Sequence, residues 1–145
     1  LVMGRGTYYK DIITDPVRIF KLENNVISAG YRKEDYFDII RLFDFGLFLV
    51  PGSDGSCRAA LEIMALGKPL VAANRGVLPE IVDNEENGLV VEDNPENLAR
   101  AMLKLANDKE LVEKFSQSAR LKIEKVFTIE SAVNKTIGLY QAVLQ

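Results

Sequence analysis

The sequence predicts an α/β fold in which helices wind over both faces of a parallel sheet. Two observations support this. Five short apolar runs, bounded by Gly, Pro or Asn, have the length and composition of strands buried on both faces. They alternate with segments of helical periodicity, which is typical of right-handed strand–helix–strand crossovers. The expected strands are Leu1–Gly4, Asn25–Gly30, Asp44–Pro51, Pro69–Ala73 and Gly88–Glu92.

Four helices are expected between these strands. The clearest pattern is that of Tyr36, Ile39, Ile40 and Phe43, which recur at i, i+3, i+4 and i+7 and so form one apolar stripe that would face the sheet. The expected helices are Pro16–Leu22, Lys33–Phe43, Cys57–Leu66 and a short segment, Leu78–Asn84.

The C-terminal third of the chain predicts three consecutive helices. Asn94 and Pro95 are a helix start, with Asn as the cap and Pro in the first turn, and Asp108 and Thr128 can cap the next two helices. No Gly/Ser linker, internal repeat or low-complexity tract divides the sequence. Residues 1–145 are therefore predicted to form one domain with a helical C-terminal tail.

Composition excludes several classes of function. The 145 residues suffice for one core that buries about 68–70% of the surface of the unfolded chain. A net charge of −3 argues against nucleic acid as a partner, and no apolar run approaches the ~20 residues of a membrane helix. With no histidine, a histidine base or metal site is excluded. The single cysteine, Cys57, fits a reducing compartment and a cytoplasmic location.

The turn Asp54-Gly55-Ser56 is the first candidate for chemistry. It follows an expected strand and precedes the helix that begins near Cys57, so free N–H groups and the helix dipole would form an anion site there. The dipole contributes about 0.3–1 kcal/mol when exposed and up to ~2 when partly buried, so a diphosphate would need further help. The alternative is that Asp54 or Ser56 simply caps the helix while Gly55 makes the turn.

Glu62 is the second candidate, because it lies in the middle of a helix that is otherwise small and apolar on nearly every side. Such a carboxylate lies either at a gap open to solvent or in a cleft. It can accept two hydroxyl groups, which suits the vicinal diol of a ribose. The alternative is an i, i+4 ion pair with Arg58, although Arg before Glu is the weaker order for a helix pair.

The third candidate is the turn Asn74–Glu80, NRGVLPE. Gly76 permits a positive φ and Pro79 can start a short helix. Arg75 would either assist phosphate binding or be solvated. This turn, like Asp54-Gly55-Ser56, follows the carboxyl end of an expected strand, where open parallel sheets bind ligands. Nothing has the spacing of metal ligands, so no metal site is predicted.

A family resemblance joins these features. The stretch VPGSDGSCRAALEIMALGKPLVAANRGVLPEIV resembles the donor-binding, C-terminal half of retaining GT-B glycosyltransferases of family four. That family's pattern runs strand, Pro-Ser, Glu, seven residues, Glu-Ala-Met-Ala-x-Gly-x-Pro-Val-Val-Ala, then Gly-Gly-x-Pro-Glu-Ile-Val. The flanking NVISAGYRKEDYFDIIRLFDFGLFLVP and GLVVEDNPENLARAMLKLANDKELVEKFSQSAR agree as well, so the resemblance covers Leu1 to Gln145. It implies a Rossmann-like domain that is one half of a GT-B fold.

The resemblance implies transfer of a sugar, with retention, from a UDP-, GDP- or ADP-sugar to an acceptor hydroxyl, with neither cofactor nor metal. Glu62 would hold the ribose, and Asp54 would lie near the transferred sugar. The other donor contacts would come from residues beside the base, the diphosphate and the sugar: Gly30, Tyr31, Gly55, Ser56, Cys57, Gly76, Val77 and Leu78. A sugar, lipid or polysaccharide acceptor would be bound by an N-terminal half, through which the parent protein could contact a membrane surface.

Two departures from the family pattern matter. The first acidic position is Asp54 where the family has Glu, a carboxylate one methylene shorter. The family's Arg and Lys that grip the diphosphate have no counterpart, and we expect them upstream of Leu1. We expect the chain to be N-terminally truncated and inactive by itself. Two alternative functions stay open: a GT-B-shaped epimerase or phosphorylase, and a non-catalytic module in which Asp54 marks a lost site.

Overall fold

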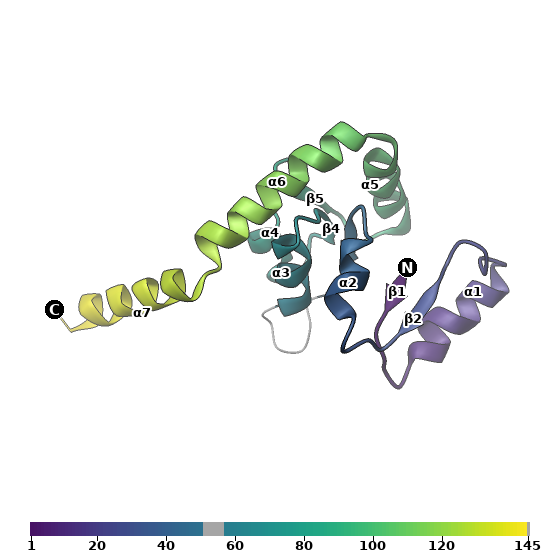
Figure 1. Cartoon of the computed structure of the whole chain (residues 1–145), viewed down its shortest axis with the longest axis horizontal. Helices are drawn as coiled ribbons and strands as arrows, with labels where there is room; N and C mark the ends of the chain where they lie inside the picture. The colour runs from purple at the N-terminus through teal and green to yellow at the C-terminus, as the bar shows by residue number, and fades with distance from the viewer. Residues whose placement is uncertain (51–56, 145) are drawn as a thin grey trace. The chain divides into compact units, whose positions relative to one another are not determined.

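The computed structural model describes residues 1–50 and 57–144, and the chain forms two compact units (Figure 1). We call Leu1–Ile39 the N-terminal unit and Ile40–Gln145 the C-terminal unit. The described strands form two parallel sheets, one in each unit, with helices beside them. The predicted α/β class with a parallel, Rossmann-like arrangement is confirmed. The assignment of residues 1–145 to one domain stays a prediction.

The N-terminal unit contains a two-stranded ladder of β1 (Val2–Met3) and β2 (Ser28–Gly30). Their connection holds the π-helical turn η1 (Lys10–Thr14), which runs directly into α1 (Asp15–Ile19). The expected helix Pro16–Leu22 therefore starts and ends earlier than predicted, and Lys21 adopts a left-handed φ of 56° just beyond its end. Residues 1–39 are all described and none of them is buried.

α2 (Tyr36–Arg41) leads into the C-terminal unit, and its least exposed residues are those of the predicted stripe, with Ile40 fully buried. The sheet that follows has the order β3-β4-β5, and its strands are parallel. All four residues of the central strand are buried. The three strands are β3 (Gly46–Phe48), β4 (Leu70–Ala73) and β5 (Gly88–Val91).

Helices cover both faces of this sheet, as predicted for a doubly wound fold. Side chains alternate along a strand, so Leu70 and Val71 of β4 point to opposite faces. Leu70 and Ile63 of α3 (Arg58–Ala65) both approach Gly46, where a Cβ would lie 2.7 Å from Leu70 Cδ2 and 3.1 Å from Ile63 Cγ2. Val71 instead belongs to a cluster on the other face.

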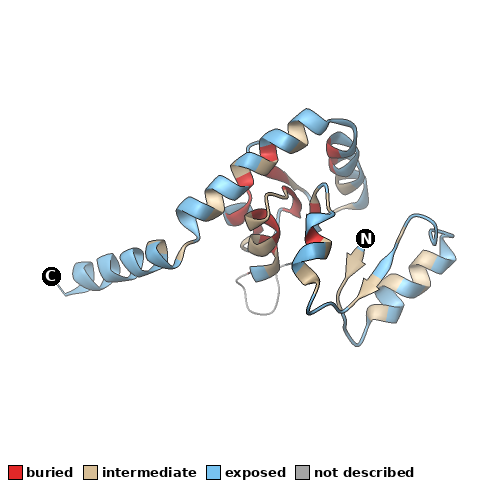
Figure 2. Cartoon of the chain, in the orientation of Figure 1, coloured by how far each residue is buried: buried red, intermediate tan, exposed pale blue. Residues whose placement is uncertain are grey.

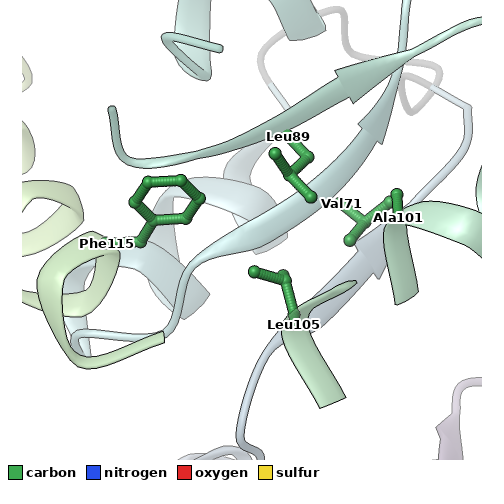
Figure 3. Close-up of a cluster of buried hydrophobic side chains, with 5 residues drawn as sticks. All are labelled: Val71, Leu89, Ala101, Leu105 and Phe115. Atoms are coloured by element: carbon green, nitrogen blue, oxygen red, sulfur yellow. The ribbon is translucent and has the colours of Figure 1, made fainter. Parts of the chain in front are cut away.

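That cluster joins the sheet to α5 (Pro95–Asn107) and α6 (Lys109–Val126) (Figure 3). Phe115 is its largest member and is fully buried. Burial of one such apolar side chain stabilises the fold by about 1.5–3 kcal/mol. The cluster consists of Val71, Leu89, Ala101, Leu105 and Phe115.

The three predicted C-terminal caps are confirmed. The side chains of Asn94, Asp108 and Thr128 accept hydrogen bonds from backbone N–H groups three residues ahead, at 2.9, 2.9 and 3.1 Å. Each such cap contributes about 0.5–2 kcal/mol. The last helix, α7 (Ile129–Val143), differs from the other two because none of its described residues is buried (Figure 2). Within residues 1–50 and 57–144, no helix has both the length and the apolar character needed to cross a membrane.

Candidate functional site

The middle of α3 presents Glu62 beside a buried face. Ala60, Ile63 and Met64 are buried, while the Glu62 side chain is 28% exposed. Arg58 Nε lies 3.4 Å from Glu62 Oε1, so the i, i+4 pair that the sequence offered as the alternative interpretation of Glu62 is present. The Arg58 side chain is 82% exposed, and pairs of this kind contribute only about 0.3–0.5 kcal/mol.

Cys57 sits at the start of α3 in a strained backbone conformation. Its φ of 48° is left-handed, and its carbonyl accepts the first helical hydrogen bond, from the Ala60 N–H at 2.8 Å. A non-glycine residue held there costs of the order of 1–3 kcal/mol. The side chain is 2% exposed, which confirms that it faces the core. The candidate residues Asp54, Gly55 and Ser56 lie outside the described residues.

The NRGVLPE turn at the carboxyl end of β4 takes the expected shape. Gly76 has a φ of 54°, and Pro79 lies in the first turn of α4 (Leu78–Ile81). Leu78 is fully buried and Val77 is partly buried. The turn therefore fixes two of its three candidate donor contacts against the body of the C-terminal unit, while Gly76 stays exposed.

Two polar contacts connect this turn to the carboxyl end of β5. Asn74 Nδ2 donates to Glu92 Oε1 at 3.0 Å, and Arg75 Nη1 donates to Asp93 Oδ2 at 3.1 Å. Arg75 is therefore not simply solvated, because it has Asp93 as a partner within the protein. Its side chain remains 57% exposed, so part of its charge is still accessible to an anion.

A third set of contacts joins α6 to the end of α4. These contacts were not predicted from the sequence. Lys122 Nζ, on α6, lies 2.8 Å from Asp83 Oδ1 and donates to the Glu80 carbonyl oxygen at 3.0 Å. The buried Asn87 then exchanges two hydrogen bonds with Asp83, at 2.8 and 3.0 Å. The sequence contained one signal, because Lys122 follows the buried Phe115 and Ala119 at i+7 and i+3 on the same helix face.

In the N-terminal unit, Gly30 and Tyr31 lie beside the turn Gly4-Arg5-Gly6, which follows β1. The Gly4 N–H donates to the Gly30 carbonyl at 2.9 Å, and the Arg5 guanidinium carbon lies 4.1 Å from the centre of the Tyr31 ring. Such a cation–π contact contributes about 0.5–1 kcal/mol at an exposed site. Gly30 has a φ of 65°, and no atom lies within 4 Å of where its Cβ would be. The Arg5 contact was not foreseen from the sequence.

An ion pair follows Tyr31 directly. Arg32 Nε donates to Asp35 Oδ1 at 2.9 Å, and Arg32 Nη2 also binds the second oxygen. This hydrogen bonding from Arg32 lowers the pKa of the Asp35 carboxyl below its ordinary value. In the C-terminal unit, a shallow cavity of about 370 Å³ lies at the junction of α6 and α7, lined by polar and charged side chains that include Glu124 and Lys135.

Comparison with known families decides the kind of protein. The sequence model for Glycosyl transferases group 1 matches residues 1–122. The chain belongs to this family. YtcC of Bacillus subtilis, provisionally named a glycosyltransferase, is 37% identical over 156 residues, covering 99% of this chain and 38% of YtcC. An uncharacterized glycosyltransferase of Methanocaldococcus jannaschii is 31% identical, covering 97% of this chain and 39% of that protein.

Solved structures of two other proteins share this chain's fold. HepE from Anabaena, in complex with UDP-glucose, superposes with a TM-score of 0.80 at 22% identity over 97% of this chain and 40% of HepE. TarM from S. aureus, in a complex that contains UDP, gives a TM-score of 0.77 at 24% identity over 95% of this chain and 28% of TarM. The predicted resemblance to one half of a GT-B glycosyltransferase is confirmed. The group 1 chain spans less than half the length of each of these proteins.

Proposed function

We propose that the parent protein transfers a sugar from a nucleoside diphosphate sugar to an acceptor hydroxyl, and that this chain binds the donor. The observation that carries the proposal is Glu62, a partly buried carboxylate at the family's second acidic position on α3. Membership of the group 1 family supports the transferase activity. The fold shared with HepE and TarM, whose structures contain UDP-glucose and UDP, supports the donor class.

In this proposal the donor's ribose hydroxyls replace Arg58 as partners of Glu62. Asp54 lies near the transferred sugar, and the amides of Gly55, Ser56 and Cys57 meet the diphosphate. The remaining contacts come from backbone at Gly76, Val77 and Leu78 and from Gly30 and Tyr31 beside the base. Residues 1–145 would act as one donor-binding domain.

The chemistry requires that negative charge on the departing diphosphate be stabilised. The N–H groups at the start of α3 suit this role, because preorganised hydrogen-bond donors aimed at developing charge usually make the largest single contribution to catalysis. We propose that transfer proceeds with retention, that an N-terminal half binds the acceptor, and that upstream cations complete the diphosphate site. The lone buried thiol of Cys57 and the donor chemistry favour a cytoplasmic parent.

The test is a calorimetric titration of the chain with UDP-glucose, GDP-glucose and ADP-glucose. We expect the chain to prefer donors with one base. The Glu62→Gln variant should bind the preferred donor about tenfold or more weakly, because a hydrogen bond to a charged group contributes about 1.5–3 kcal/mol. Glu124→Gln is the matched control, since Glu124 also forms an i, i+4 pair with an Arg, at 2.8 Å from Arg120 Nε. It should leave binding unchanged.

Two results would contradict the proposal. Equal donor affinity for the wild-type chain and Glu62→Gln would show that Glu62 does not contact the donor, and would favour a non-catalytic module. Failure to bind any of the three donors, repeated with the upstream residues restored, would remove the donor site altogether.

A further inference from the structure

α4 is a single helical turn whose position cannot come from its own stability. It has four residues, far fewer than an isolated helix needs, and so it relies on outside contacts. Leu78 and Ile81 anchor its inner side, since both are buried. The residues just before α4 are held by the pair of Arg75 and Asp93. The end of α4 is held from α6, by Lys122.

The Lys122 ammonium makes two contacts that suit the end of a helix. The Glu80 carbonyl, which it binds at 3.0 Å, is one of the terminal carbonyls of α4 that have no helical partner and carry the negative end of the helix dipole. Asp83, which it meets at 2.8 Å, begins the turn into β5. The Lys122 side chain is only 13% exposed, so water competes weakly for these bonds.

Both sides of this contact are fixed by their own surroundings. On α6, Phe115 and Ala119 are fully buried on the same face as Lys122, so its backbone is firmly seated. On the other side, Asp83 cannot turn away freely, because Asn87 holds both its second carboxylate oxygen and its backbone N–H. A buried amide, a carboxylate and a lysine thus join α6, α4 and the start of β5.

We propose that Lys122 is a positioning residue that sets where α4 stands and, through it, the Gly76–Leu78 backbone. Its consequence for donor binding rests on the proposed function, which brings that backbone against the sugar nucleotide. Lys122 itself touches no substrate. Without its charge, the end of α4 loses its partner on α6, and the short helix opens more often than the sheet beneath it.

Lys104 provides a matched comparison. It contacts Glu85 in the same connection between α4 and β5, with Nζ 2.8 Å from Glu85 Oε2, and so is the same type of residue bound to the same type of group. Its side chain is 45% exposed, however, and its two described hydrogen bonds both go to Glu85, which lies outside α4. An exposed pair of this kind contributes little, so its loss should leave α4 where it is.

The experiment measures amide hydrogen exchange by NMR in the wild-type chain, Lys122→Met, Lys122→Arg and Lys104→Met. The reporters are Ile81 and Val82 at the end of α4, whose N–H groups donate to the carbonyl oxygens of Val77 and Leu78. We expect Lys122→Met, which keeps the apolar stem, to speed exchange at both by about tenfold or more. Lys122→Arg should restore most of the protection, and Lys104→Met should match the wild type.

Asp83→Asn is a second variant that weakens the same contact from its other side, should Lys122→Met fold poorly. Unchanged exchange at Ile81 and Val82 in Lys122→Met and Asp83→Asn, or an equal rise in Lys104→Met, would overturn the positioning role.

A titration with UDP-glucose separates this proposal from the donor site itself. If the wild-type chain binds UDP-glucose, Lys122→Met should bind it several-fold more weakly and Lys122→Arg should recover the affinity. Faster exchange with unchanged UDP-glucose affinity would overturn the link from Lys122 to the donor. If the wild-type chain with its upstream residues binds no UDP-glucose, the proposed function fails, while the exchange data still decide whether Lys122 positions α4.

Discussion

The N-terminal and C-terminal units use the same local pattern, a parallel strand followed by a Gly-containing turn, but they support it differently. In the N-terminal unit two short strands form one ladder, and none of its residues is buried. In the C-terminal unit helices cover both faces of three strands, and β4 is entirely buried. A two-stranded ladder is marginal by itself in water. The comparison teaches that the motif gives the geometry of a turn, whereas burial gives its rigidity.

The turns themselves show the same contrast. At the ends of β1 and β2, the Gly4–Gly30 backbone hydrogen bond, the stacking of Arg5 on Tyr31 and the Arg32–Asp35 pair hold the chain, all without a buried side chain. At the ends of β4 and β5, two side-chain contacts, from Asn74 and Arg75, add to buried Leu78. Segments with few buried contacts open locally at low free energy. We therefore expect the candidate base contacts to be more mobile than the Gly76–Leu78 backbone.

The largest effect should come from the core that only the C-terminal unit has. Phe115→Ala removes a fully buried ring and should lower the free energy of unfolding by about 3–5 kcal/mol. Phe20→Ala, at a residue 70% exposed in the N-terminal unit, should change it by less than about 0.5 kcal/mol. Urea denaturation followed by circular dichroism measures both. Similar losses in the two variants would erase the contrast between the units.

A smaller effect should follow from adding one methyl group to a glycine in each unit. A Cβ at Gly88 would lie 2.4 Å from the Leu70 carbonyl oxygen, so Gly88→Ala forces β5 away from β4 and should cost about 1–3 kcal/mol. At Gly6 nothing lies within 4 Å, and Gly6→Ala should be neutral or slightly stabilising. The same denaturation assay applies. A Gly88→Ala variant as stable as Gly6→Ala would mean that β4 and β5 approach less closely than described.

The pair of Arg75 and Asp93 should contribute less again. A double-mutant cycle with Arg75→Gln and Asp93→Asn should give a coupling of about 0.2–1 kcal/mol, because both side chains are about half exposed. Salt screens exposed charges, so the coupling should shrink at high ionic strength. The free energy of unfolding of the wild type, the two single variants and the double variant, determined at low and at high salt, gives this coupling. A coupling that does not change with salt would show that the contact is not electrostatic.

The smallest effect should be on stability at acidic pH, through the pair of Arg32 and Asp35. Because Arg32 lowers the pKa of Asp35 in the folded chain, the pair stabilises the fold at pH values above the ordinary carboxyl pKa of about 3.9. That contribution is lost as the pH falls through the lowered folded pKa. NMR titration of the Asp35 carboxyl should give a midpoint below the ordinary value, and Arg32→Gln should raise it. An identical midpoint in the two proteins would show that the pair does not form in solution.

Sequence reasoning succeeded where the chemistry is local. Asn94, Asp108 and Thr128 all cap helices, because a cap depends on a side chain and a backbone N–H only three residues apart. The pair of Arg58 and Glu62 followed from helical spacing in the same way. The family resemblance supplied the candidate donor contacts. All of them stay predictions, and Asp54, Gly55 and Ser56 also lie outside the described residues.

Contacts between distant segments could not be foreseen. Lys122 and Glu80 are 42 residues apart, and Arg75 and Asp93 are 18 apart on segments whose alignment depends on strand register. The end of α4 shows the same limit. The expected helix ran to Asn84 but stops at Ile81, because the chain turns extended at Val82 and Asn87 then binds the Asp83 N–H. Helix propensity alone does not reveal that Asn87, in the following turn, takes the Asp83 N–H that a longer helix would use.

The buried position of Cys57 has a practical consequence for spectroscopy. It is the one cysteine in the sequence, and its side chain is 2% exposed. Thiol reagents need an accessible thiolate, so Cys57 should react slowly in the folded chain. A cysteine introduced at an exposed residue such as Gln117 on α6 should then take up a fluorophore or spin label first. The native sequence is in this respect already a single-site labelling background, with no need to replace Cys57.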